Sequence, residues 1–91
     1  MMDTKTFDLT IVTPEETLYN GPAVSLVAPG EMGYVGILAN HAPLLSTLTA
    51  GKVVAKKESG EALKFESTGK GFLEVFKNTV TLLLDAAKPA S

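Results

Sequence analysis

The sequence predicts a single all-β domain, built as a sandwich or a barrel. Apolar residues recur at nearly every second position, as at Phe7, Leu9 and Ile11, which is the period of a half-buried strand. Turn residues interrupt these runs at short, regular intervals, as they do in all-β domains. The chain has 91 residues, 45% of them hydrophobic, which suits one domain with its own core.

Breaker residues separate the expected strands in the first half of the chain. Since proline cannot donate a ladder hydrogen bond, Pro14, Gly21-Pro22 and Pro29-Gly30 are interpreted as strand ends. Glycines at 30, 33 and 36 then predict a tight segment of turns that ends at Pro43. The strands expected here are 7–11, 17–20 and 24–28.

The second half alternates strands with compact turns. Ser59-Gly60-Glu61 and Lys77-Asn78 each join two apolar runs and therefore predict hairpins. The strands expected here are 44–49, 53–58, 62–67, 72–76 and 79–84. The domain is expected to cover residues 1–86, and residues 87–91 are expected to form a short, frayed tail.

The composition excludes several function classes. The chain has no Cys and one His, so thiol chemistry, disulfides and Cys-based or multi-His metal sites are ruled out. We expect no metal and no other cofactor. The formal net charge is −2 and Arg is absent, whereas nucleic-acid modules carry a basic face and use Arg, so nucleic acid is not an expected partner. No apolar run has the length of a signal sequence or a membrane helix.

His41 is the one candidate for acid–base catalysis. Its neighbours Asn40, Ala42 and Pro43 include no carboxylate that could orient it. We therefore interpret His41 as a residue that fixes a turn, and we predict no catalytic residue. The glycines at 30, 33 and 36 lack the dinucleotide-binding spacing, and no helical pattern follows them.

Met32, Tyr34 and Val35 are large apolar residues in the glycine-rich segment. Exposed apolar side chains on a loop often mark a contact surface. The same side chains could instead fold back onto the core of the domain. The sequence leaves these two interpretations open.

Three separated segments resemble the ε subunit of bacterial F-type ATP synthases. Residues 36–45 read Gly-Ile-Leu-Ala-Asn-His-Ala-Pro-Leu-Leu, similar to the family's Gly-Val-Leu-Pro-Asn/Gly-His-Ala-Pro-Leu-Leu, and the preceding residues 29–35 look like its Pro-Gly-x-x-Gly stretch. Residues 71–87 resemble the family's Gly-Phe-Leu-Glu-Val and Val-Thr-Val-Leu-Ala-Asp segments. Residues 7–15 are similar to its opening. The matches occur in the family's order and span nearly the whole chain.

The resemblance implies a flattened ten-stranded β-sandwich and a non-catalytic role in the rotor. In the family, one part of this domain grips the γ subunit. The implied c-ring contacts are a loop and a nearby turn, here Glu31, Met32, Gly33, Tyr34 and Val35, and Asn40, His41, Ala42 and Pro43. By joining γ to the c ring, such a subunit helps couple proton translocation to ATP synthesis.

The resemblance also implies a location in the cell, and the chain differs from the family pattern in two respects. The subunit would be a monomer when isolated, present as one copy per complex, on the cytoplasmic face of the bacterial membrane and peripheral to it. Tyr34 stands where many members carry an acid, and Ala39 where they carry Pro. Family members continue into two C-terminal helices that inhibit ATP hydrolysis and in some bacteria bind ATP, and we expect these functions to be absent from this chain.

Two other function classes are alternatives. A free-standing β-barrel module could bind nucleic acid or a small ligand, and it would show salt-sensitive binding to oligonucleotides. An enzyme that uses His41 would lose its turnover on His41→Ala without losing stability.

Overall fold

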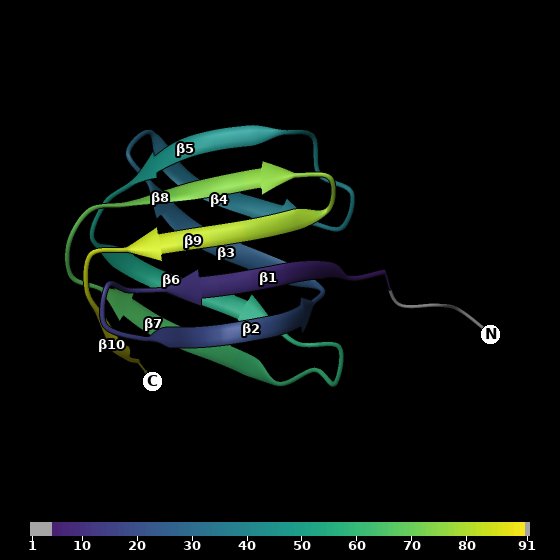
Figure 1. Ribbon diagram of the computed structural model, residues 1–91, viewed down its shortest axis with the longest axis horizontal. Coiled ribbons are helices and arrows are strands. Elements are labelled where there is room, and N and C mark those ends of the chain that lie inside the picture. The colour runs from purple at the N-terminus through teal and green to yellow at the C-terminus, as the bar shows by residue number, and fades with distance from the viewer. Residues whose placement is uncertain (1–4, 91) are drawn as a thin grey trace.

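Alternating burial along the strands shows why this sequence forms two packed layers. In β8 (Gly71–Phe76) every second residue is buried and the residues between them are exposed, so one side of the strand faces a core. β1 (Phe7–Val12) and β9 (Thr79–Leu84) alternate in the same way. The computed structural model of the protein describes residues 5–90, which contain ten strands and no helix (Figure 1). The other strands are β2 (Thr17–Ala23), β3 (Ser25–Gly30), β4 (Gly33–Leu38), β5 (Leu44–Leu48), β6 (Gly51–Lys56), β7 (Ala62–Ser67) and β10 (Ala87–Pro89).

One sheet curls on itself to make both layers. Its strand order is β10-β7-β6-β3-β5-β8-β9-β1-β2, and β4 pairs with the other edge of β3. In Figure 1 the front layer consists of β5, β8, β9, β1 and β2, and the rear layer of β4, β3, β6, β7 and β10. The layers join where Gly30 of β3 meets Leu48 of β5. The all-β sandwich predicted from the sequence is therefore confirmed.

The core lies between the layers, and among residues 5–90 it is apolar apart from one buried hydroxyl. Leu9, Leu26 and Leu73 are each fully buried, and they come from β1, β3 and β8. Ser67 is the buried polar residue, and its Oγ donates a hydrogen bond to the Gly69 carbonyl at 3.2 Å. The other buried core residues are Phe7, Ile11, Ala23, Ala28, Ile37, Leu48, Val53, Ala55, Val75, Val80, Leu82 and Leu84.

Of the residue pairs interpreted as strand ends, Gly21-Pro22 lies inside a strand, because β2 continues to Ala23. Pro29-Gly30 does close its strand, since β3 ends at Gly30. Pro22 is tolerated because β2 is an edge strand that pairs with β1 alone, so the missing N–H disrupts no second ladder. Pro29 lies where β3 is leaving its pairing with β6, which extends only to Val27.

The glycine-rich segment forms a strand, which corrects the prediction of a run of turns. Only Gly33 of the three glycines has a positive φ, at +125°, and it follows the two-residue turn between β3 and β4. Gly36 lies within β4, opposite Val27. Gly30 and Gly33 do flank a tight turn, whereas Gly36 marks none, because glycine also occurs inside edge strands.

The expected frayed tail is likewise corrected in part. Ala87–Pro89 form β10, which pairs antiparallel with β7 from Ser67 to Phe65. The edge of β7 offers backbone groups that the short tail can satisfy, and local composition carries no sign of this. Residues 1–4 of the expected domain and Ser91 of the expected tail lie outside the described residues.

Candidate functional site

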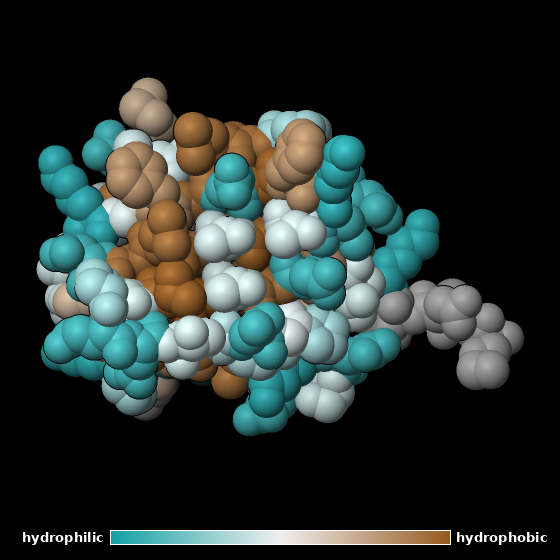
Figure 2. Space-filling model, viewed as in Figure 1, coloured by the Kyte–Doolittle hydropathy of each residue, from teal (hydrophilic) through white to brown (hydrophobic). Residues whose placement is uncertain are grey.

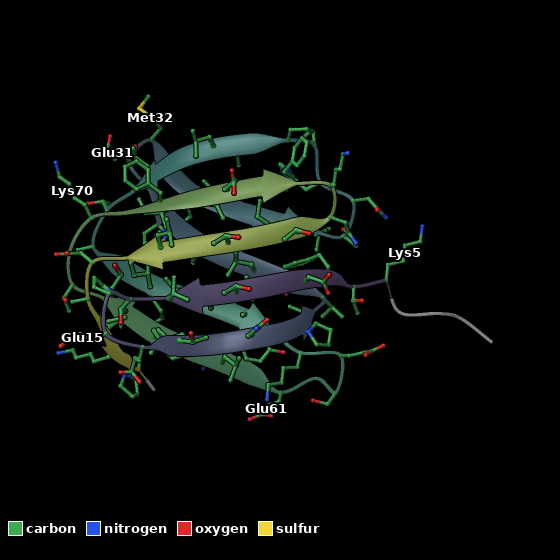
Figure 3. All side chains as sticks on the ribbon, viewed as in Figure 1. Lys5, Glu15, Glu31, Met32, Glu61 and Lys70 are labelled. Carbon is green, nitrogen blue, oxygen red and sulfur yellow. The ribbon has the colours of Figure 1, made fainter. Side chains whose placement is uncertain are left out.

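The turn between β3 and β4 displays the side chains expected to form an interaction loop. Gly30 pairs with Gly33, so Glu31 and Met32 form the tip of a tight hairpin. Both project from a corner of the sandwich in Figure 3, and Met32 is 101% exposed. A Cβ added to Gly30 would lie 2.7 Å from the Gly33 carbonyl oxygen, so glycine is required for the strands to approach this closely.

The sequence left open whether Tyr34 and Val35 are exposed or pack onto the core, and on β4 the two residues differ. Tyr34 is 64% exposed, whereas Val35 packs partly against the core. Tyr34 faces Pro29 across the ladder, and a Cβ added to Gly51 would lie 3.2 Å from the Tyr34 hydroxyl oxygen. The tyrosine therefore leans over the outer surface of the rear layer and is not at the tip of the turn.

The turn after β4 is braced by an asparagine from another hairpin. The backbone N–H of Asn40 donates to Oδ1 of Asn78 at 2.7 Å, and Nδ2 of Asn78 donates to the Thr6 carbonyl at 2.8 Å. Asn40 itself has a φ of +64°, a conformation that asparagine adopts more readily than most residues. Sequence reasoning noted Asn78 only as a turn residue, since nothing local shows that it reaches residues so distant in the chain.

His41 forms a local contact and no catalytic pair. Its Nδ1–H donates to the Ala42 carbonyl oxygen at 2.7 Å, as expected for a residue that fixes a turn. The ion pair found among residues 5–90 joins Lys57 to Glu61 at 3.2 Å, so no carboxylate in this part of the chain is paired with His41. The side-chain arrangement around it therefore lacks the orienting acid that nucleophilic catalysis requires.

The structure places the two predicted contact elements at opposite ends of β4. The Glu31–Met32 turn precedes the strand, and Asn40–Pro43 follows it. A six-residue strand is about 20 Å long at ~3.3 Å per residue. The elements thus share one edge of the sandwich without touching, and a single small ligand could not contact both.

An apolar outer face on the front layer was missed by the sequence analysis. Leu45 of β5, Phe72 of β8 and Leu83 of β9 are 73%, 51% and 50% exposed. Phe72 and Leu83 are paired across the ladder, and Figure 2 shows apolar side chains gathered toward the left of this face. The available signal was a pair of apolar residues in adjacent positions, as in Phe72-Leu73 and Leu82-Leu83, since adjacent strand residues point to opposite faces.

Hollows extend this face in both directions. One of about 430 Å³ is bounded by Val12, Pro14, Phe72 and Leu83, with Lys70 and Asp85 also in its wall. Another of about 470 Å³ lies between Phe76 and the Asn40–Pro43 turn. Leu45, Phe72, Phe76 and Leu83 together form the front apolar face. Because the second hollow lies between Phe76 and the Asn40–Pro43 turn, this face is continuous with the turn that carries His41.

The described part of the chain contains neither a group of metal ligands nor a membrane-spanning helix. Within residues 5–90, no three His, Asp or Glu side chains are grouped so that they could hold a metal ion. The same residues include no helix with the length and hydropathy needed to cross a membrane.

A family model described as the ATP synthase, Delta/Epsilon chain, beta-sandwich domain matches residues 6–90. The chain belongs to this family. Among curated relatives, the ATP synthase epsilon chain of Leptospira borgpetersenii is 47% identical over 78 residues, which cover 86% of this chain and 60% of the relative. That of Xanthomonas campestris is 47% identical over 77 residues, covering 85% of this chain and 54% of the relative. The chain thus spans somewhat more than half the length of these ε relatives.

Solved structures support the fold of this ε-family domain. It is similar to a chain of the Euglena gracilis mitochondrial ATP synthase, an OSCP/F1/c-ring assembly, with a TM-score of 0.84 at 21% identity, over 98% of this chain and 56% of that one. A chain in the central stalk/c-ring structure of the Tetrahymena thermophila enzyme gives a TM-score of 0.75 at 18% identity, over 97% and 69% of the two chains. At these identities the likeness shows a shared fold.

Proposed function

We propose that this chain is the β-sandwich part of a non-catalytic rotor subunit that joins the γ subunit to the c ring of an F-type ATP synthase. Membership of the delta/epsilon family is the observation that carries the proposal. The apolar face and the two exposed turns support it, because they suit a part that is held between other proteins. By this connection the subunit helps couple proton translocation to ATP synthesis.

The front apolar face is the proposed γ-binding surface. Four large apolar side chains, each at least half exposed, lie on three adjacent strands. Exposed apolar area of this kind gains free energy when a partner removes it from water. The hollow beside Phe72 and Leu83 offers a place for an apolar anchor, which is the usual centre of such an interface.

The turns at the two ends of β4 are the proposed c-ring contacts. Glu31 and Met32 project into solvent at one end, and His41 lies in the turn at the other. Tyr34 replaces the acid of many family members, so this contact would be apolar or hydrogen-bonded, with Glu31 as the nearby acid. In this arrangement one copy of the subunit lies at the cytoplasmic face of the bacterial membrane and meets the membrane only through the c ring.

Co-expression with the γ subunit of the same organism tests the proposal. The wild-type chain should co-purify with γ, and Phe72→Ser with Leu83→Ser should abolish the complex. Val27→Ser is a matched control, because Val27 is 41% exposed on the opposite layer, and it should leave the complex intact. Failure of the folded wild-type chain to bind γ would overturn the proposal. Salt-sensitive binding to oligonucleotides would favour the alternative of a free-standing binding module.

A further inference from the structure

β4 (Gly33–Leu38) is an edge strand without the usual protection. Within the part of the chain that the structure describes it pairs with β3 alone, and it bounds the rear layer in Figure 1. Natural edge strands usually carry Pro, Lys or a bulge, or are very short, since a regular edge invites pairing with another chain. β4 contains no proline and no charged residue, and its register against β3 is unbroken. The outer side of β4 is therefore open to a further strand.

The other edges are protected in the expected ways. β2 contains Pro22 and meets β1 in an irregular register. β10 has three residues and includes Lys88 and Pro89. The outer edge of β5 is tied to the β3–β4 turn, because the N–H of Glu31 donates to the Thr47 carbonyl oxygen at 3.2 Å. Among residues 5–90, β4 is thus the edge that is regular, uncharged and free along its whole length.

Hydrogen bonds near the β3–β4 turn show which backbone groups of β4 face outward. Tyr34 lies opposite Pro29, which has no N–H, and the Pro29 carbonyl oxygen accepts from the N–H of Thr49, just after β5, at 2.8 Å. The Tyr34–Pro29 pair therefore exchanges no hydrogen bond across the ladder. Hydrogen-bonded and non-hydrogen-bonded pairs alternate in antiparallel sheets, so the N–H and C=O groups of Tyr34, Gly36 and Leu38 point away from β3.

This outward row of backbone groups is accessible. Tyr34, Gly36 and Leu38 are all exposed. The Tyr34 ring leans over Gly51, where an added Cβ would lie 3.2 Å from its hydroxyl oxygen, and so it does not cross the free edge. A Cβ added to Gly36 would meet nothing within 4 Å. The N–H and C=O groups of three residues are therefore available to another strand.

The row is complementary to itself. Residues that lie opposite each other in a ladder share a face, so outward side chains must meet outward side chains. Aligning Gly36 with Gly36 of a second, antiparallel copy places Tyr34 opposite Leu38 in both directions. All three pairs are then hydrogen-bonded pairs, which makes about six hydrogen bonds at two for each pair. A shifted alignment centred on Val35 or Ile37 would keep only about four.

The same alignment brings apolar side chains together and sets no like charges opposite each other. Leu38 of one copy would lie beside Tyr34 of the other, and apolar area of both would be removed from water. A glycine pair at the two-fold axis lets the strands approach closely. The Glu31–Met32 turn of each copy would lie beside the Asn40–Pro43 turn of the other, which brings an acid toward His41.

We propose that two copies of this chain pair through the free edges of β4, antiparallel about Gly36, so that their rear layers join into one sheet. The two-fold arrangement is closed, because each copy uses the same edge. A single pair of strands makes a small interface, so the dimer is weak and forms at high concentration. The family resemblance implies a monomer, and the unprotected edge is the reason to expect a concentration-dependent dimer.

Pairing would compete with the proposed rotor contacts. It covers Tyr34 and brings a second domain beside the turns at both ends of β4, which are the proposed c-ring contacts. Free chains would then be held in pairs, whereas an assembled rotor would take single copies. This consequence rests on the proposed function, whereas the dimer itself rests only on the edge of β4.

Sedimentation velocity of the full 91-residue chain measures the association. Between about 10 µM and about 1 mM, the range of a weak complex, the average mass should rise from that of one chain toward that of two and no further. Amide hydrogen exchange at Tyr34, Gly36 and Leu38 should slow over the same range. Exchange at Val35 and Ile37, whose N–H groups already face β3, should not change.

Matched lysine substitutions locate the contact. Gly36→Lys should raise the concentration needed for the dimer at least tenfold, because two ammonium groups would meet at the two-fold axis, and the open space at Gly36 accommodates the side chain. Asn20→Lys is the control on the protected edge strand β2, where Asn20 is exposed, and it should change this concentration less than twofold. Both variants change the net charge equally, so a general charge effect would act on both.

Disulfide trapping tests the alignment independently of the lysine variants. The chain has no Cys, and the Cα atoms of a hydrogen-bonded antiparallel pair are about 5.5 Å apart, which a disulfide can span. Gly36→Cys should therefore form a covalent dimer in oxidised glutathione at least tenfold faster than Asn20→Cys.

Several results would overturn the inference. These are a monomeric mass up to about 1 mM, equal weakening by the two lysine variants, equal rates of disulfide formation, oligomers that grow beyond two copies, or exchange protection centred on β8 and β9, which would assign the dimer to the front apolar face. None of these measurements involves γ or the c ring, so their failure would leave the proposed function standing. Failure to co-purify with γ would equally leave the dimer standing.

Discussion

Asn78 is predicted to stabilise the domain by connecting three distant parts of the chain. Its side chain makes two hydrogen bonds, to Asn40 and to Thr6, and its backbone φ is +59°. At about 1 kcal/mol for each hydrogen bond, Asn78→Gly should lower the free energy of unfolding by about 2 kcal/mol. Asn78→Ala should cost about 1 kcal/mol more, because alanine is strained at a positive φ.

Thermal unfolding followed by circular dichroism measures this difference. For a domain of this size about 1 kcal/mol corresponds to a shift of 4–8 °C, so Tm should fall by about 10 °C for Asn78→Gly and about 15 °C for Asn78→Ala. Hydrogen exchange at the Asn40 amide should accelerate in both variants. Lys77→Gly is the control, since Lys77 also has a positive φ, of +48°, in the same turn and makes only an exposed contact with Phe76.

The control should change the stability by less than about 1 kcal/mol, because a surface cation–π contact contributes little. If Asn78→Gly leaves Tm within 2–3 °C of the wild type, about the shift expected from half of one hydrogen bond, the bracing argument is wrong. If Lys77→Gly lowers Tm as much as Asn78→Gly, the effect belongs to the turn backbone and not to the Asn78 side chain.

Three further predictions concern the core, the exposed tyrosine and nucleotide. Leu73→Ala should cost about 2–5 kcal/mol because Leu73 is fully buried, whereas Phe72→Ala, one residue away on the outer face, should cost about 1 kcal/mol or less in chemical denaturation. Tyr34→Ala should weaken binding to the c ring while lowering the Tm of the isolated domain by only a few degrees, and a large loss of Tm would contradict its assignment as a contact residue. ATP should leave Tm unchanged in a thermal-shift titration, and a dose-dependent rise would reveal a nucleotide site.

Local pattern predicted the strands that alternate strongly and have regular turns. Lys77-Asn78 was correctly read as a hairpin, and both residues have the positive φ of such a turn. β4 was missed because Gly33 and Gly36 look alike in the sequence, although one ends a turn and the other lies within a strand. Glycine permits both conformations, so the choice depends on the pairing with β3 that only the fold provides.

The candidate surfaces likewise depend on strand pairing, which local sequence does not show. The sequence left open whether Met32 is exposed or folds back onto the core, and the structure shows it exposed at the tip of the β3–β4 turn. Adjacent apolar pairs indicate that some apolar side chains face outward, but the sequence does not show that Leu45, Phe72 and Leu83 meet from three strands to form one face. Which face a strand turns outward is set by its partners, and a shift of one residue would reverse it.

The pairing of β1 with β9 has a consequence for the order in which the protein can form. This parallel contact joins residues 8–12 to residues 79–83, so β1 cannot complete its pairing until β9 has formed. Before then β1 can pair only with β2, and the apolar side chains of Phe7, Leu9 and Ile11 lack the rest of the sheet that buries them, which favours aggregation. Folding that depends on contacts so distant in the sequence is slow.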